Sequence, residues 1–157
     1  MKVSDILRVK GGTLFTVSPG ESLSAALDVM SQQDIGSLVV MDHGELVGML
    51  TFREVIKAVV DNGGALGATL VQAVMDAAPL TCTPETDLDE VRRMMLGRHA
   101  RYLPVMSERT LNGVISFYDV AKAVVDSQDF ENRMLKAYIR DWPVDSRDEL
   151  PSSNPPN

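Results

Sequence analysis

Two hydroxyl–carboxylate pairs with the same spacing are the residues of this chain best suited to chemistry. Thr51 precedes Glu54 by three positions, and Ser116 precedes Asp119 by three positions, each where an apolar run meets a helical pattern. One interpretation is a capping box, in which the hydroxyl accepts from the N3 amide and the carboxylate accepts from the N-cap amide. The other is a ligand site. There, the hydroxyl and the helix N-terminus would bind phosphate, and the carboxylate would accept both hydroxyls of a ribose.

A glycine also precedes each pair by three positions, at Gly48 and Gly113. The missing side chain has two interpretations at this stage. It could let a flat base approach the backbone, or it could allow a helix to pack closely on the strand.

The remaining reactive residues do not form a catalytic pattern. Cys82 is the single cysteine, which excludes an intrachain disulfide and indicates a reducing compartment. Its apolar neighbours favour a buried, inert thiol over a nucleophile. His43 and His99 have no metal-ligand spacing with each other or with Cys82. We therefore expect neither an enzyme nor a metal site.

Composition indicates an ordered globular protein with an acidic surface. The formal net charge is −7 and the pI is about 4.7, which disfavours binding to nucleic acid. No apolar run approaches the roughly 18 residues of a membrane span. The N-terminus lacks the apolar core of a secretory signal. These features predict a cytoplasmic protein that binds neither membranes nor nucleic acid.

The chain repeats itself at an offset of 65 residues. Residues 15–61 align with residues 80–126 without a gap, and 16 of the 47 pairs are identical. A further match pairs "VSDIL" from Val3 with "VMDAA" from Val74, with six extra residues in the first copy. A long period present only twice indicates one duplicated supersecondary unit.

Each copy predicts a β-α-β-β-α unit, so the fold class is α+β with two repeats related by a pseudo-twofold axis. Helical periodicity follows each proline, and two apolar runs of strand length flank a turn before a second helix. The predicted boundaries are a first repeat at 1–62, a glycine-rich connector at 63–73, a second repeat at 74–126, a C-terminal helix at 127–142 and a disordered tail at 143–157.

The repeated unit, its "G-x-apolar-Ser/Thr-x-x-Asp" ending and its "RYLPV" strand resemble a tandem pair of cystathionine-β-synthase-type (CBS) domains, a Bateman module. The segment "VVDSQDFENRMLKAYI" is similar to the tail of stand-alone bacterial members. The resemblance implies a regulatory protein that binds AMP, ADP, ATP, NAD(H) or S-adenosylmethionine in two clefts between the repeats. It implies no obligatory cofactor. It also implies a homodimer that signals to an unidentified effector protein.

The resemblance also implies which residues line each cleft. In the first cleft Ser116 would contact phosphate, Asp119 would bind the ribose, and the other members would be Thr13, Phe15, Ile35, Gly36, Ser37, Arg101 and Tyr118. The second cleft would use Leu80, Ala100, Arg101, Tyr102, Thr51, Arg53 and Glu54. Because Glu54 stands where the family usually has aspartate, we expect this second cleft to be empty, weaker or differently occupied. The alternative function is a dimerisation scaffold in which both pairs are only helix caps.

Overall fold

The computed structural model describes residues 1–140. Met1–Val120 form one compact unit and Ala121–Asn157 a second, and each is described by itself. The predicted tail at 143–157 lies outside the described residues, as do the last two residues of the predicted C-terminal helix.

The first hairpin and its helices follow the predicted pattern. Strands β1 (Thr16–Val17), β2 (Ser37–Asp42) and β3 (Glu45–Thr51) form a sheet in that order, with β1 parallel to β2 and β2 antiparallel to β3. Helices α2 (Leu23–Gln33) and α3 (Phe52–Asp61) pack on it through buried apolar residues that include Leu23, Leu38 and Leu50. Ser22 caps α2 by accepting from Ala25 N–H at 3.1 Å.

The second copy builds the same unit again. Strands β4 (Tyr102–Ser107) and β5 (Thr110–Ser116) are antiparallel, and α5 (Leu88–Arg98) precedes them. Both hairpins shift register at the same place, between Val40 and Met41 and between Val105 and Met106. Cys82 forms a parallel bridge with Val105, so it occupies the position that β1 has in the first copy. The predicted α+β fold of two repeated units is confirmed.

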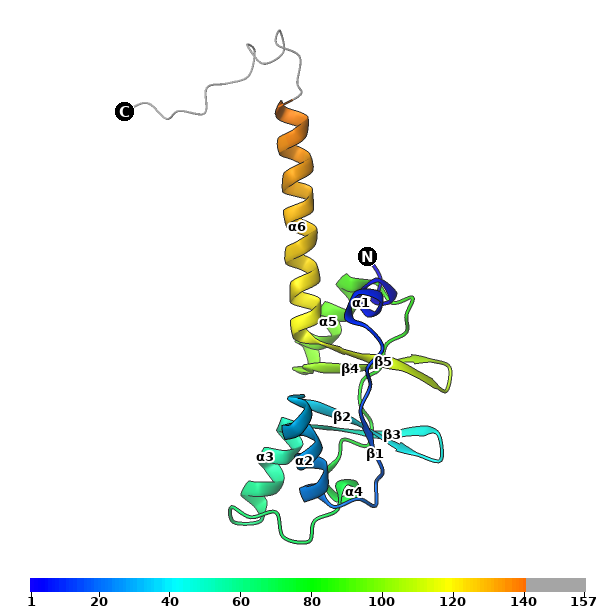
Figure 1. Cartoon of the computed structure of the whole chain (residues 1–157), viewed down its shortest axis with the longest axis vertical. Coiled ribbons are helices and arrows are strands. Elements are labelled where there is room, and N and C mark those ends of the chain that lie inside the picture. The colour runs from blue at the N-terminus through cyan, green and yellow to red at the C-terminus, as the bar shows by residue number, and fades with distance from the viewer. Residues whose placement is uncertain (141–157) are drawn as a thin grey trace, which may run out of the picture. The chain divides into compact units, whose positions relative to one another are not determined.

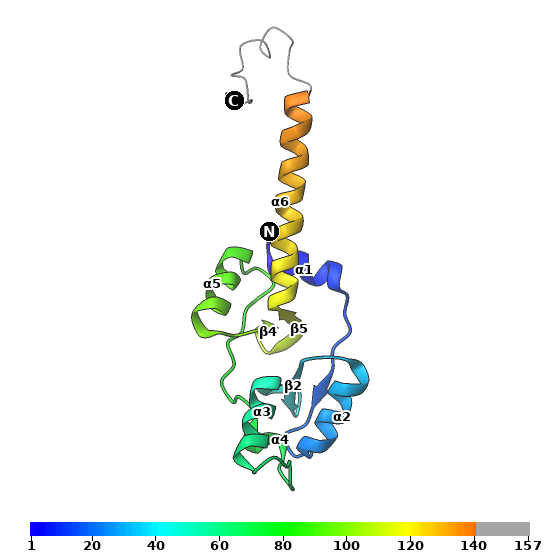
Figure 2. The same ribbon diagram turned by 90° about the vertical axis from the view of Figure 1, so that its left-hand side faces the viewer.

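The repeats exchange a short segment, which the sequence did not predict. Helix α1 (Val3–Lys10) contacts β5 of the second copy, and α4 (Val71–Val74) contacts β3 of the first. We therefore distinguish a first lobe, residues 16–76, from a second lobe, residues 1–10 and 80–120. Figures 1 and 2 show the chain between α1 and β1 passing from the second lobe to the first.

Matching backbone hydrogen bonds hold the exchanged segments. Val3 N–H donates to Thr86 O at 3.0 Å and Ser4 N–H to Pro84 O at 2.9 Å. In the other lobe, Val71 N–H donates to Glu21 O at 2.9 Å and Gln72 N–H to Pro19 O at 3.0 Å. Val3 therefore corresponds to Val71, an offset of 68 residues, and the sequence match of Val3 with Val74 was wrong. The predicted connector at 63–73 also contains the start of α4.

The two strand glycines accommodate these exchanged segments. A Cβ on Gly48 would lie 2.6 Å from Met75 Sδ and 2.8 Å from Asp76 O, and a Cβ on Gly113 would lie 3.0 Å from a methyl group of Leu7. Of the two interpretations of these glycines, the structure supports close packing, because protein atoms occupy the space that a base would need.

Helix α6 is longer than predicted. It runs without a break over Phe117–Arg140, so residue 126 is not a helix boundary, and the described part of the predicted C-terminal helix continues the last helix of the second repeat. The apolar residues spaced along it, Phe130, Met134, Leu135, Tyr138 and Ile139, are exposed.

Candidate functional site

Ser116 and Asp119 form a closed capping box at the start of α6. Ser116 N–H donates to Asp119 Oδ2 at 2.8 Å, and Asp119 N–H donates to Ser116 Oγ at 3.0 Å. Both predicted halves of the motif are therefore present at this pair, and they fix the side chains relative to the helix. The Asp119 side chain retains 17% exposure.

A lysine from the exchanged segment completes this site. Lys10 is the last residue of α1, and its Nζ lies 2.7 Å from Asp119 Oδ2 and 2.8 Å from Val114 O. Partial burial acts to raise the pKa of Asp119. The hydrogen bonds from Lys10 and Ser116, with the positive charge of Lys10, outweigh burial and lower that pKa below its ordinary value.

The lowered pKa predicts how stability depends on pH. The Asp119 carboxylate contributes stability that is complete above its unfolded pKa of about 3.9 and is lost as pH falls through the lower folded value. We expect Asp119→Asn to be less stable than the parent protein by a constant amount between about pH 5 and 7, with the difference shrinking below about pH 4. Urea unfolding at each pH measures this. A difference that widens on acidification would contradict it.

Part of the hydrogen-bonding capacity of this site is unused. Within residues 1–140, Asp119 Oδ1 and the Ser116 hydroxyl proton have no hydrogen-bond partner. The ammonium of Lys10 carries three protons and donates two hydrogen bonds. One acceptor and two donors therefore remain at the start of α6.

The corresponding pair of the first repeat has a different geometry. Thr51 Oγ1 accepts from Arg53 N–H at 3.2 Å and donates to both carboxylate oxygens of Glu54, at 3.1 and 3.0 Å. The carboxylate therefore binds the threonine hydroxyl and not the N-cap amide, so Thr51 and Glu54 do not form the capping box of the first interpretation. The extra methylene of glutamate lets its carboxylate reach the hydroxyl, which then has no proton left for a ligand.

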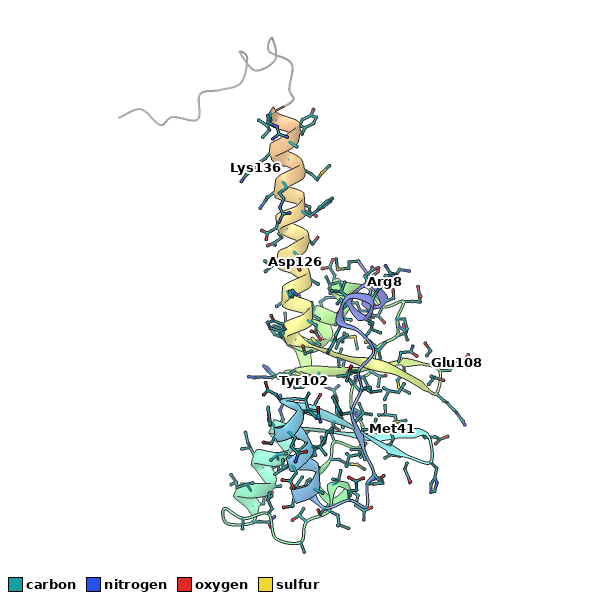
Figure 3. The ribbon with its side chains drawn as sticks, viewed as in Figure 1. Arg8, Met41, Tyr102, Glu108, Asp126 and Lys136 are labelled. Atoms are coloured by element: carbon teal, nitrogen blue, oxygen red, sulfur yellow. The ribbon has the colours of Figure 1, made fainter. Side chains whose placement is uncertain are left out.

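Side chains also join the two lobes. Arg53 Nη2 of the first lobe donates to His99 O of the second. Tyr102 contacts Gly36 so closely that a Cβ there would lie 2.0 Å from the phenol oxygen, with a Phe52 carbon at 3.2 Å. Figure 3 shows Tyr102 between the two hairpins. Arg53 and Tyr102 of the predicted second cleft therefore lie at this junction.

Comparison with known proteins agrees with this architecture. The family model described as "CBS domain" matches the chain twice, over residues 3–61 and 71–126. The chain belongs to the CBS-domain family. Its two matches make it a tandem CBS-domain pair.

Relatives of this CBS-domain pair match most of its length. The CBS domain-containing protein CBSX3, mitochondrial, of Arabidopsis thaliana is 29% identical over 147 residues, covering 88% of this chain and 71% of that protein. The crystal structure of the CBS-domain containing protein ATU1752 from Agrobacterium tumefaciens is 33% identical, with a TM-score of 0.75, covering 78% of this chain and 98% of that chain. The crystal structure of CBSX2 in complex with AMP has a TM-score of 0.67 at 23% identity, covering 81% and 98%, and shows similarity of fold.

The other predicted site residues lie on several elements of the CBS-domain pair. Phe15 and Ile35 pack against the core of the first lobe, and Ser37 pairs with Thr51 across the sheet. The remaining members are the exposed Thr13, Arg101 and Tyr118 and the half-buried Leu80 and Ala100. Arg101 O accepts from Phe117 N–H at 2.7 Å, which fixes that residue beside the start of α6.

Sequence reasoning missed Lys10. It assigned the N-terminal segment to the first repeat, whereas the segment packs on the second. No sequence signal identifies it, because the correspondence of Val3 with Val71 comes from the backbone hydrogen bonds that place each leading segment on the other repeat. With that placement, the end of α1 falls beside β5 and the start of α6.

Among residues 1–140, the other reactive groups do not form a second site. Burial raises the pKa of the Cys82 thiol to about 12, which leaves almost no thiolate at neutral pH and disfavours the nucleophile interpretation. Residues 1–140 contain no cluster of three or more potential metal ligands. No helix in the described part of the chain is both long and apolar enough to cross a membrane. The cytoplasmic location remains a prediction from sequence.

Proposed function

We propose that this CBS-domain pair is a non-catalytic regulatory module. It binds an adenosyl ligand at the start of α6 and transmits the binding to a partner protein. The observation that carries the proposal is the unused capacity of Ser116 and Asp119, which are held in a capping box and still offer a hydroxyl proton and a carboxylate oxygen. A hydroxyl donor beside an acceptor-only carboxylate suits phosphate and ribose hydroxyls respectively.

The difference between the two pairs supports this site over its counterpart. Thr51 donates its hydroxyl proton to Glu54, so a phosphate at α3 would have to displace an internal hydrogen bond. The Ser116 proton is not used in this way. In the proposal, the ligand therefore occupies the Asp119 site first. The set containing Thr51, Arg53, Glu54, Leu80, Ala100 and Tyr102 binds more weakly or not at all.

In the proposal, the wall of the site comes from the segment that links the two lobes and from the first lobe. Thr13 and Phe15 follow Lys10 by three and five residues, and this segment, with Ile35, Gly36 and Ser37, would contact the base. The AMP complex of CBSX2, which has the same fold, supports an adenosyl compound as the ligand class. Tyr118 and Arg101 flank the start of α6 and would contact the ring system and the phosphates.

A thermal-shift panel with AMP, ADP, ATP, NADH and S-adenosylmethionine tests the proposal. A ligand that binds only the folded state adds RT ln(1 + [L]/Kd), or about 2.7 kcal/mol when its concentration is 100 times Kd. We expect at least one of these compounds to raise the melting temperature in a saturable way. Guanosine monophosphate is the control for recognition of the adenine base. The absence of any shift at millimolar concentrations would refute the proposal.

The second candidate, a dimerisation scaffold, has its own observation. Phe52, Ile56 and Val60 are exposed at helical spacing along α3, at 52, 63 and 70%. Such an apolar row favours contact with another protein surface. In both candidates we propose a homodimer, and the thermal-shift panel separates them because a pure scaffold does not respond to nucleotides.

A further inference from the structure

We propose that Lys10 determines which adenosyl ligands the site accepts, favouring those that carry phosphate over the cationic S-adenosylmethionine. The inference deepens the proposed function and rests on it, because it concerns the same site at Asp119. Lys10 would act as a specificity-determining residue through its charge and its third, unused proton.

The first step is that Lys10 is held in place. Its ammonium donates to Val114 O at 2.8 Å and to Asp119 Oδ2 at 2.7 Å, so two contacts fix it between β5 and α6. Its backbone is the end of α1, which packs on β5 through Leu7 against Gly113. Both ends of the Lys10 side chain are therefore anchored, which directs its ammonium to the start of α6.

The second step is the balance of charge at this site. Asp119 supplies one negative charge, which Lys10 neutralises by direct contact. Arg101 is held beside the start of α6 by its carbonyl bond to Phe117 N–H, and the helix N-terminus adds partial positive charge. The Asp119–Lys10 pair is therefore neutral, and the helix N-terminus leaves the site partly positive. An isolated aspartate would attract a sulfonium cation, whereas this arrangement disfavours it and attracts a phosphate.

The third step is that the other half of the molecule has no such cation. The segment after α4, residues 76–80, reads Asp-Ala-Ala-Pro-Leu and contains neither lysine nor arginine. Glu54 has no ion pair among residues 1–140, and its carboxylate accepts the Thr51 hydroxyl instead. The lysine is therefore a feature of one site and not a general consequence of the repeated fold.

The test compares the affinities of AMP and S-adenosylmethionine for the full chain by isothermal titration calorimetry. Both ligands share the adenosyl group, so the ratio of their Kd values cancels any change in ribose binding and reports the change of charge at Asp119 when Lys10 is removed. Lys10→Met removes the charge and Lys10→Arg keeps it. Lys2→Met is the matched control, because Lys2 also flanks α1 but pairs with the exposed Glu85 at 3.0 Å.

We expect the parent protein, Lys10→Arg and Lys2→Met to prefer AMP by similar factors, and Lys10→Met to lose roughly tenfold or more of that preference. Cooperative unfolding of each variant, followed by circular dichroism, shows that each is folded. An unchanged ratio in Lys10→Met, or a parent protein that prefers S-adenosylmethionine, overturns this inference and leaves the proposed function standing. AMP binding without S-adenosylmethionine binding in both the parent and Lys10→Met also overturns it. Failure of the parent to bind either ligand refutes the proposed function itself.

Discussion

We expect Asp119→Ala to abolish most of the stabilisation by AMP that the proposed function predicts. The substitution removes the carboxylate that we propose binds the ribose, and a hydrogen bond to a charged group contributes about 1.5–3 kcal/mol. We therefore expect Kd to rise by at least about tenfold. The measurement is the AMP dependence of the melting temperature, followed by titration calorimetry. The ligand-free variant should itself be less stable by about 1 kcal/mol, because the capping box is lost.

Glu54→Ala is the matched control. It removes the carboxylate at the equivalent position of the first repeat, where the hydroxyl and carboxylate bind each other. We expect this variant to keep most of the AMP response. If Glu54→Ala lost the response and Asp119→Ala kept it, the ligand would occupy the other half of the molecule and our assignment of the two sites would be reversed.

Val3→Asp should destabilise the protein more than any other single change considered in this chain. Val3 is 0% exposed in the second lobe, although it lies at the start of the sequence. Burying a carboxylate without a partner is strongly unfavourable, and we expect the free energy of unfolding to fall by about 3 kcal/mol or more. Urea unfolding monitored by circular dichroism gives this value. Amide exchange in β5 should accelerate more than in β3, because α1 covers only the former.

Val9→Asp tests whether burial is the cause. Val9 lies in the same helix and is 82% exposed, so the same substitution should change stability by less than about 0.5 kcal/mol. Equal urea midpoints for Val3→Asp and Val9→Asp would show that α1 does not pack on the second lobe in solution.

Features of the fold that depend on neighbouring residues were predictable from the sequence. The hairpins, their turns and the helix faces arise from local periodicity, and the duplication showed each of them twice. The exchange of α1 and α4 was not predictable in this way, because periodicity states that a face is apolar and not which sheet it covers. For a related reason, residue 126 ends the second family match but does not end the helix. The repeat ends there in sequence, but nothing in "VVDSQDF" stops a helix.

The candidate site was predictable in its residue types and not in its contacts. Spacing identified both hydroxyl–carboxylate pairs and offered a capping box at each, but the structure closes the box at Ser116 and Asp119 and not at Thr51 and Glu54. The Glu54 side chain is one methylene longer than that of Asp119, and sequence spacing does not describe this difference in how far the carboxylate reaches. Lys10 lies 109 residues from Asp119, so only the three-dimensional fold could bring them together.

The exchanged helix also sets an order for assembly during translation. The first lobe is contiguous, and all its strands and helices have left the ribosome once residue 76 has emerged. The second lobe needs Val3, Leu7 and Lys10 from the beginning of the chain and β5 from near residue 116. Helix α1 is therefore synthesised before the strand on which it packs, and a nascent chain arrested before β5 would carry an undocked α1 beside a completed first lobe.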